Sequence, residues 1–233
     1  MKKHGKKYRA ALEKIGDPNK ARSLPEAVNL IKTTSPTKFD ATIEIHLRTG
    51  CDPKQADEMV RAVLVLPHGT GKSKRIAVFG DATEQEKAKK AGAEVVGGEE
   101  LITKVEKGNI DFEVAIATPE MMKKLAKAAK VLGPKGLMPS PKSGTVTTDV
   151  TKAVEEIKKG KIEFKLDKQS LIHSILGKTS FSESAILENL KAFLKALKEA
   201  KPSGVKGTYI ESMYLTTSMG PSVALNISEA MSV

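Results

Sequence analysis

The stretch 216–223, which reads TTSMGPSV, carries the residue types best suited to chemistry in this chain. Thr216, Thr217, Ser218 and Ser222 place hydroxyl groups beside the bare backbone of a glycine. Such hydroxyls suit the sugar edge of RNA, because a ribose 2′-OH both donates and accepts hydrogen bonds. They do not form a nucleophilic site, since no histidine stands nearby in the sequence to act as a base. Taken alone, these residues also fit an ordinary Gly-Pro hairpin.

Two predicted strands position this stretch. The run 208–215 is rich in β-branched and aromatic residues, and 223–227 has alternating apolar positions. A hairpin bend therefore falls at 219–221, where glycine permits a positive φ or the close approach of a partner, and proline fixes the exit direction. The candidate RNA-binding residues of this hairpin are Thr217, Ser218, Met219 and Gly220.

A second segment, 38–50, reads KFDATIEIHLRTG and predicts another part of the same surface. Its apolar and polar residues alternate strictly from 42 to 48, as in a half-exposed strand, so Thr42 and Glu44 project from one face. Lys38 supplies a partner for a phosphate, and Phe39 supplies an apolar or stacking surface.

The carboxylate of Glu44 is unusual in an RNA site because it repels phosphate. It can accept a hydrogen bond from a base amino group or a 2′-OH, which gives specificity instead of affinity. The alternative interpretation of Glu44 is a surface salt bridge.

The charge balance favours an anionic partner. The 233 residues include 39 Lys and Arg against 28 Asp and Glu, a formal net charge of +11, which points to nucleic acid first and an acidic membrane surface second. Residues 68–158 hold 16 basic and 13 acidic residues, and the flanking portions hold 23 and 15. The flanks should therefore make most of the polyanion contacts. Aromatic residues are only 4% of the chain, which disfavours recognition by a platform of stacked bases.

The lone Cys51 excludes an intrachain disulfide and fits a reducing cytoplasm. The N-terminal MKKHGKKYR is basic but leads into no apolar segment, so it does not resemble a secretory signal. We expect this arm either to lie along phosphates or to be disordered. No stretch approaches the roughly 18 apolar residues needed to span a bilayer, so no membrane association is predicted.

Strand and helix patterns predict an α/β fold with two domains. Between 68 and 159 the order β-α-β-α-β-α, with strands at 75–79, 93–96 and 114–117, predicts a Rossmann-like three-layer domain. Residues 1–67 and 160–233 hold too few elements for separate cores, and together they predict a discontinuous domain with a split β-α-β antiparallel sheet covered by helices. The inserted domain would then be joined through a double-stranded hinge near Pro67-His68 and Lys159-Gly160.

Capping patterns predict where several helices begin. Serine or threonine followed three residues later by glutamate forms a capping box, and the pairs are Ser23 with Glu26, Thr83 with Glu86, and Ser180 with Glu183. The helix that begins at Pro119 is expected to run to about Leu132.

No enzyme motif is complete. Gly71-Lys72-Ser73 resembles the end of a phosphate-binding loop, but Leu66 stands where its first glycine is needed, and a strand follows instead of a helix. No G-x-G-x-x-G follows the strand at 75–79. We therefore predict that the protein is not an enzyme and uses no cofactor. A generic adaptor acting through a helix face would leave the clustered hydroxyls and basic flanks unexplained.

The remaining polar residues suggest structural roles. The histidines at 4, 46, 68 and 173 show no metal-ligand spacing, so no metal is predicted, and His46 and His173 are expected to be polar partners of the sheet. The loop 133–144 carries Lys135 and Lys142 and could touch RNA, although a structural role in the inserted domain is the favoured interpretation.

Four motifs together resemble the L-one family of bacterial large-ribosomal-subunit proteins. They are LPHGTGK at 66–72, GPKGLMPSPKSGTV at 133–146, and the segments 38–50 and 216–223 described above. The resemblance covers nearly the whole chain, in the same order and at matching spacing. It implies a monomer within the ribosome of the cytoplasm, in the mobile stalk beside the tRNA exit site.

The resemblance also implies partners and positions. The first domain would bind a helix-and-loop element of large-subunit rRNA, and the stalk would assist release of deacylated tRNA. A similar RNA fold in the protein's own operon mRNA would be bound to repress translation. The positions that match the family's RNA-binding residues are Phe39, Thr42, Glu44, Ser212, Ser218, Met219 and Gly220, with Lys168 a weaker candidate.

Two positions depart from the family pattern. Ser218 stands where a third threonine is common, which keeps the hydroxyl and loses a methyl group. The segment 166–170, LDKQS, lacks the asparagine and glycine usual around that Asp-Lys pair, which weakens the expectation for Lys168.

Overall fold

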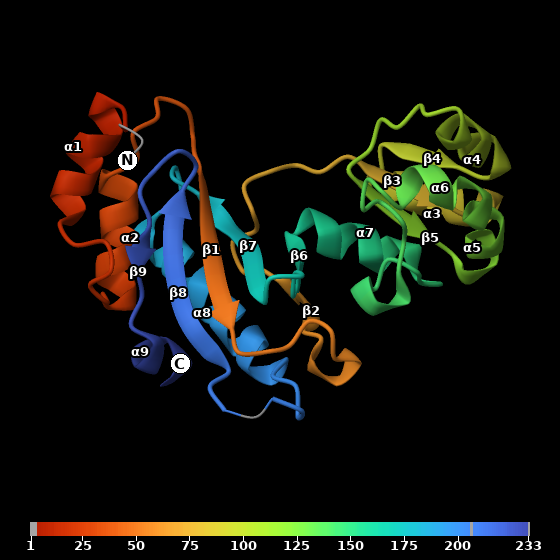
Figure 1. The fold of residues 1–233 in the computed structure, drawn as a ribbon. Coiled ribbons are helices and arrows are strands. Elements are labelled where there is room, and N and C mark those ends of the chain that lie inside the picture. Colours follow the sequence, from red (N-terminus) through yellow and green to blue (C-terminus); the bar gives the residue numbers. More distant parts are fainter. Residues whose placement is uncertain (1–3, 206, 233) are drawn as a thin grey trace. The chain divides into compact units, whose positions relative to one another are not determined.

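The computed structural model describes residues 4–205 and 207–232. The chain divides into two compact units, one formed by residues 1–71 with 160–233 and the other by 72–159 (Figure 1). The predicted fold class, antiparallel and parallel sheets in a mixed α/β chain, is confirmed. The predicted hinge between the two units stays a prediction.

The first unit contains a four-stranded antiparallel sheet with the strand order β7-β1-β8-β9 and a two-stranded ribbon of β2 and β6. A single bridge between Leu166 and Ile172 links the ribbon to β7. The strands are β1 (Thr42–Thr49), β2 (Arg61–Val65), β6 (Lys161–Lys165), β7 (Leu171–Lys178), β8 (Ile210–Thr217) and β9 (Val223–Ala224). The helices are α1 (Lys6–Ile15), α2 (Leu24–Thr33), η1 (Ala56–Glu58), α8 (Glu183–Glu199) and α9 (Ile227–Ser232).

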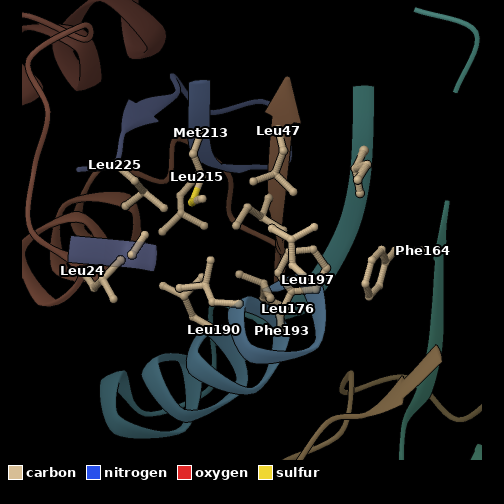
Figure 2. Close-up of a cluster of buried hydrophobic side chains, with 14 of the residues drawn as sticks. Leu24, Leu47, Phe164, Leu176, Leu190, Phe193, Leu197, Met213, Leu215 and Leu225 are labelled. Carbon is tan, nitrogen blue, oxygen red and sulfur yellow. The ribbon is translucent and has the colours of Figure 1, made fainter. Parts of the chain in front are cut away.

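The core of this unit forms because alternate residues of the sheet face the helices α2 and α8. Ile43, Ile45 and Leu47 of β1 are buried to 1% exposure or less, whereas the residues between them are partly exposed. Figure 2 shows the cluster, in which Leu190, Phe193 and Leu197 of α8 lie among the side chains of the strands. The rings of Phe164 and Phe193 pack with their centroids 5.0 Å apart.

The point where the chain leaves and re-enters this unit is tightly fixed. The buried amide of Asn189 on α8 accepts a hydrogen bond from the His68 nitrogen at 3.0 Å and donates to the carbonyls of Gly69 and Leu176 at 3.1 and 2.8 Å. A Cβ on Gly160 would lie 2.4 Å from the Cα of Gly69, so the outgoing and incoming segments touch through glycine backbone. Residues 68–71 are therefore held in the first unit, four residues beyond the predicted boundary.

The second unit has a parallel three-stranded sheet with the order β4-β3-β5. Alternate residues of β3 enter two separate hydrophobic clusters, so the central strand is buried on both faces. Ser143 and Thr145 hold the loop after α6 through hydrogen bonds to Ser140, which supports a structural role for that loop. The elements are β3 (Ile76–Phe79), α3 (Ala82–Lys90), β4 (Val95–Gly97), α4 (Glu99–Glu106), β5 (Val114–Ala117), α5 (Pro119–Leu125), η2 (Ala126–Ala128), α6 (Ala129–Leu132), η3 (Pro141–Ser143) and α7 (Val150–Lys158).

Several local predictions were wrong. The helix from Pro119 is interrupted at 126–128 by a 3₁₀ turn. The second strand of the hairpin ends at Ala224, because Asn226 accepts backbone hydrogen bonds that begin α9. Residues 6–15 form α1, which buries Ala11 and Ile15, so the part of the basic arm from Lys6 to Arg9 is not disordered. Contact of the arm with phosphates stays a prediction, and residues 1–3 lie outside the described residues.

The three predicted capping boxes do not form as expected. Ser23 is the N-cap of α2 but makes no side-chain cap, and the Glu26 carboxylate instead accepts from Arg22 Nη1 at 2.7 Å. Asp81, with Glu84, caps α3 in place of Thr83. Ser182 caps α8 in place of Ser180, whose Oγ donates to Asp40 at 2.9 Å. In the described part of the chain, no helix is long and apolar enough to cross a membrane.

Candidate RNA interface

The outer face of the four-stranded sheet carries most of the predicted site residues. Strand β1 lies between β7 and β8, and its outward residues pair with outward residues of both neighbours. Glu44 lies opposite Thr216 and Ile175, and His46 lies opposite Tyr214 and His173. These side chains are partly or fully exposed, because the helices of the core pack against the other face.

Three segments distant in sequence meet at one end of this sheet. The Ser218 nitrogen donates to the Thr42 carbonyl at 2.9 Å, which fixes the hairpin against the start of β1. The Lys178 ammonium donates to Thr42 Oγ1 at 3.0 Å and to the Asp40 carbonyl at 3.3 Å. The loop that contains Lys38 and Phe39 is thereby held next to the hairpin.

Two large apolar side chains are exposed at this end. Phe39 is 61% exposed and Met219 is 76% exposed. Exposed apolar surface that is contiguous and rimmed by polar residues is typical of an interaction site, whereas apolar residues exposed singly are common on any surface. Lys38 is exposed next to them and supplies a positive charge.

The hairpin turn fixes Met219 in an uncommon backbone conformation. The Gly220 nitrogen donates to the Thr217 carbonyl at 2.8 Å and closes the turn. Met219 has a φ of 66°, in the left-handed region that favours glycine. The positive φ expected at Gly220 is therefore at Met219. Gly220 is needed for another reason, since a Cβ there would lie 2.2 Å from Thr217 Oγ1.

The four hydroxyls of this stretch do not share one surface, contrary to the expectation. Thr217 is only 3% exposed, since it continues the inward row of Met213 and Leu215. Thr216 Oγ1 faces outward and donates to the Gly220 carbonyl at 3.3 Å. Ser218 is half-buried at the tip. Thr217 therefore supports the turn from beneath, and Thr216 and Ser218 remain near the surface.

Thr42 and Glu44 differ in exposure although they lie on the same strand face. Thr42 is 9% exposed because Lys178 covers its hydroxyl. The Glu44 side chain is 37% exposed, and its ion-pair partner among the described residues is His46, with 3.6 Å between Oε2 and Nε2. The Glu44 side chain is thus partly open to a hydrogen-bond donor from outside.

Ser212 and Lys168 lie at the opposite end of the sheet. Ser212 pairs with Arg48, near the end of β1, and Thr49 donates to the carbonyl of Ser170 at 2.9 Å. Six residues of strand separate this end from Thr42, which corresponds to about 20 Å. The structure therefore divides the predicted residues into a main group around the hairpin and a distant pair.

The turn that presents Lys168 is held by its own hydrogen bonds. Asp167 Oδ1 accepts from the nitrogens of Gln169 and Leu171 at 2.8 and 2.7 Å. Ser170 adopts a φ of 63°, a conformation that glycine enters more easily. Ser170 therefore takes the left-handed position in this turn without a glycine, and the Lys168 side chain is exposed.

Sequence reasoning missed Lys178 and Asp40. Asp40 accepts from the hydroxyls of Thr179 and Ser180 and from the Ser180 nitrogen, each at 2.9 Å, and so ties the loop before β1 to the end of β7. Lys178 lies outside the four motifs, and although Asp40 lies within the segment 38–50, only the pairing of β1 with β7 shows that the two residues come together. A signal existed for Thr217, because the alternation of β8 places it on the buried side.

His46 and His173 form a cross-strand pair at the centre of the outer face. Their Nδ1 atoms are 2.7 Å apart. Burial and the second imidazole lower the pKa of His46, and Glu44 opposes this effect. In the described residues, no group of three or more His, Cys, Asp or Glu side chains is arranged to hold a metal ion. The prediction that both histidines serve as polar partners of the sheet agrees with this geometry.

The fold defines the class of protein, a two-unit α/β protein in which one sheet leaves a polar face open to solvent. The profile of the Ribosomal protein L1p/L10e family matches residues 30–221, and the chain belongs to that family. The resemblance to this ribosomal family and the prediction that the protein is not an enzyme are thereby confirmed.

Similar proteins extend this result over almost the whole chain. The large ribosomal subunit protein uL1 of Dehalococcoides mccartyi is 50% identical over 97% of this chain and 96% of its own length. The protein of the same name from Lactobacillus delbrueckii is 47% identical over 97% of both chains. That of Streptomyces coelicolor is 50% identical over 97% of this chain and 93% of its own.

Proposed function

We propose that this protein is a structural constituent of the large ribosomal subunit that binds large-subunit rRNA through the outer sheet face of its first unit. The central observation is the pair of exposed apolar side chains, Phe39 and Met219, held beside Lys38 and Ser218 at one end of that face. Membership of a ribosomal protein family supports the choice of rRNA as the partner.

The arrangement gives each residue a distinct role. Phe39 and Met219 would pack on nucleotides, and Lys38 would pair with a phosphate. Ser218, Gly220 and Glu44 would contact the sugar edge, where a 2′-OH can donate to the carboxylate. Thr217, Thr42 and Lys178 would hold the hairpin in place from beneath, and the distant pair Ser212 and Lys168 would meet RNA only if it extends along the strands.

The family resemblance supports a wider proposal for the ribosome of the cytoplasm. The rRNA element would be the mobile stalk beside the tRNA exit site, where the protein, bound as a monomer, would assist the release of deacylated tRNA. The same sheet face would bind a similar fold in the protein's own operon mRNA and repress its translation. Binding of both RNAs to one face predicts that they compete.

Substitutions in the hairpin test the RNA site. A lost interface hydrogen bond costs on the order of 1–3 kcal/mol, so Ser218→Ala should weaken binding of an rRNA stalk transcript about tenfold or more. Met219→Asp should weaken it further, because it removes packing and adds a charge that repels phosphates. Aspartate tolerates the left-handed conformation better than most residues, which limits damage to the turn.

Lys72→Ala is the matched control, because Lys72 is an exposed basic residue outside the hairpin. It lies in the loop whose sequence resembles part of a nucleotide-binding motif. Binding by this variant should be nearly unchanged. If Lys72 proved critical while Ser218 and Met219 were neutral, the assignment of the hairpin as the RNA site would be wrong. Thermal unfolding of all three variants checks that the hairpin changes leave stability near that of the parent.

Two further measurements test the electrostatics and the location. Affinity should fall as salt rises, with a slope smaller than the net charge suggests, because hydroxyl and apolar contacts release no counterions. A chain of residues 1–71 joined by a short linker to 160–233, which keeps the contacts of His68 and Gly69 with Asn189, should keep most of the binding. Loss of specific binding by such a chain, when folded, would assign the site to the second unit.

A further inference from the structure

The imidazoles of His46 and His173 occupy the centre of the outer sheet face, between the hairpin end and the Ser212 end. The two Nδ1 atoms are 2.7 Å apart, which requires one hydrogen between them. The remaining nitrogens point toward carboxylates. His46 Nε2 is 3.6 Å from Glu44 Oε2, and His173 Nε2 is 3.8 Å from Asp167 Oδ2.

This geometry fixes how many protons the pair can take up. In the neutral pair each ring carries one N–H. The hydrogen between the Nδ1 atoms belongs to one ring, so the Nε2 of that ring is bare and directs its lone pair toward a carboxylate. The other ring carries its hydrogen on Nε2. The four side chains form a row in the order Glu44, His46, His173, Asp167. In either tautomer, the carboxylate at one end of this row therefore faces a ring nitrogen that has no hydrogen to donate.

A single added proton removes that conflict. Placed on the bare Nε2, it gives both rings an N–H that faces a carboxylate and leaves the hydrogen between the Nδ1 atoms in place. A second added proton would have to enter between the Nδ1 atoms, where two hydrogens would collide. Each carboxylate oxygen then has to move only slightly closer to the Nε2 atom that it faces to come within hydrogen-bond distance.

We propose that His46 and His173 are part of the RNA-contacting face and that RNA binding is coupled to the uptake of one proton from solvent by this pair. The proposal rests on the proposed function, since it concerns the same sheet face. It deepens that function by adding a proton-linked contact midway between the two groups of candidate residues, where an RNA that reaches both ends must cross.

The charges around the pair explain the direction of the coupling. On the outer face the neighbours are Glu44 and Arg48 from β1, Tyr214 from β8, and Asp167 in the turn before β7. Arg48 is paired with Glu211 at 2.8 Å, and Lys165 and Lys168 lie on and after β6. With a neutral pair, Glu44 and Asp167 leave the centre of the face negative. One proton offsets one of these charges, and a nearby phosphate favours that proton.

The test measures the Kd of the full chain for an rRNA stalk transcript at constant ionic strength between about pH 8 and about pH 6, the range in which an imidazole titrates. Binding by the parent protein should tighten with acidification, by up to about tenfold per pH unit where one proton is taken up. The double variant His46→Gln, His173→Gln should bind with little pH dependence, because glutamine keeps the polar side chain but does not titrate.

His68→Gln is the matched control. His68 is also partly exposed and also faces a carboxylate, with its Nε2 2.6 Å from Glu188 Oε2, but it is bonded to α8 and not to the outer sheet face. This variant should keep the full pH dependence of the parent. A pH dependence that survives in the double variant, or that is lost with His68→Gln, would overturn the proposal.

A second measurement covers the case in which the double variant does not fold. NMR titration of the imidazole protons in the parent protein should show one shared titration for His46 and His173, shifted to higher pH when the transcript is bound. Independent titrations that RNA does not move would overturn the coupling. Tight binding with no pH dependence would reject this inference alone, whereas absence of binding at every pH would reject the proposed function as well.

Discussion

The four-stranded sheet of the first unit and the three-stranded sheet of the second differ in how many of their faces helices cover. In the first unit, α2 and α8 cover one face, and the burial of β1 alternates along the strand. In the second unit both faces are covered, and all four residues of β3 are buried. Parallel sheets commonly need cover on both sides, whereas antiparallel sheets can leave one face in water. Only the first unit can therefore present a row of strand side chains to a partner.

Substitutions in the two cores give the largest expected effects. Phe164 and Phe79 are both buried to 1% exposure or less, one in each unit. Replacing either with alanine should cost about 3–5 kcal/mol of unfolding free energy. Because the cores are separate, Phe79→Ala destabilises only the second unit and should leave RNA binding at low temperature nearly intact. Phe164→Ala destabilises the RNA-binding unit, so RNA binding should be lost when that variant is heated. Calorimetry with binding assays checks this, and equal loss of binding in both variants would contradict it.

Asn189→Ala should have the next largest effect. The substitution leaves the His68 nitrogen and the carbonyls of Gly69 and Leu176 without their partner. Each buried group left unsatisfied costs about 1–3 kcal/mol, with the total reduced by water entry. Denaturant unfolding should show the loss in the first unit. Ser184→Ala on the exposed surface of the same helix is the control and should change stability little.

Gly220→Ala should affect recognition more than stability. The new Cβ would lie 2.2 Å from Thr217 Oγ1, so either the Thr217 side chain that supports the turn or the tip of the hairpin must shift. We expect RNA affinity to fall by about tenfold or more, similar to the loss of an interface hydrogen bond. Gly5→Ala, where a Cβ meets nothing within 4 Å, is the control. Unchanged affinity in the Gly220 variant would argue against a role for the hairpin tip.

The smallest effect concerns pH and the loop that carries Phe39. Burial raises the pKa of Asp40, but hydrogen bonds from Ser180 and Thr179 and the charge of Lys178 outweigh it and lower the pKa below 3.8. The folded state therefore binds fewer protons than the unfolded state as the pH falls below about 4, and stability decreases in that window. Asp40→Asn should reduce this dependence in acid unfolding curves. An unchanged acid transition would show that the contacts of Asp40 add nothing to stability.

The sequence predicted the parts of the fold that depend on local pattern. Alternation located β1 and its buried side, and the apolar run 114–117 matches β5 residue for residue. The cap at Ser23 failed to form because Pro25 occupies the first turn and Arg22 binds Glu26. Such competition between neighbours does not appear in a spacing rule.

The site was predicted less completely, because its geometry depends on pairing between distant strands. The motifs indicated Phe39, Glu44 and Met219 as candidates, but no local pattern shows that β7 lies beside β1. That pairing brings Lys178 to Thr42 and His173 to His46. It also sets Lys168 at the far end of the sheet, although its motif gives no hint of this distance.

The backbone contact between Gly69 and Gly160 makes the inserted segment exchangeable. Since the two ends of the insertion already touch within the first unit, closing that gap with a linker of a few residues adds little loop entropy, and the cost grows only slowly with loop length. Any compact module whose own termini are adjacent could therefore stand in place of residues 72–159 without changing the chain path of the RNA-facing unit. A reporter domain or a second binding module could therefore be inserted between the segments that carry Gly69 and Gly160.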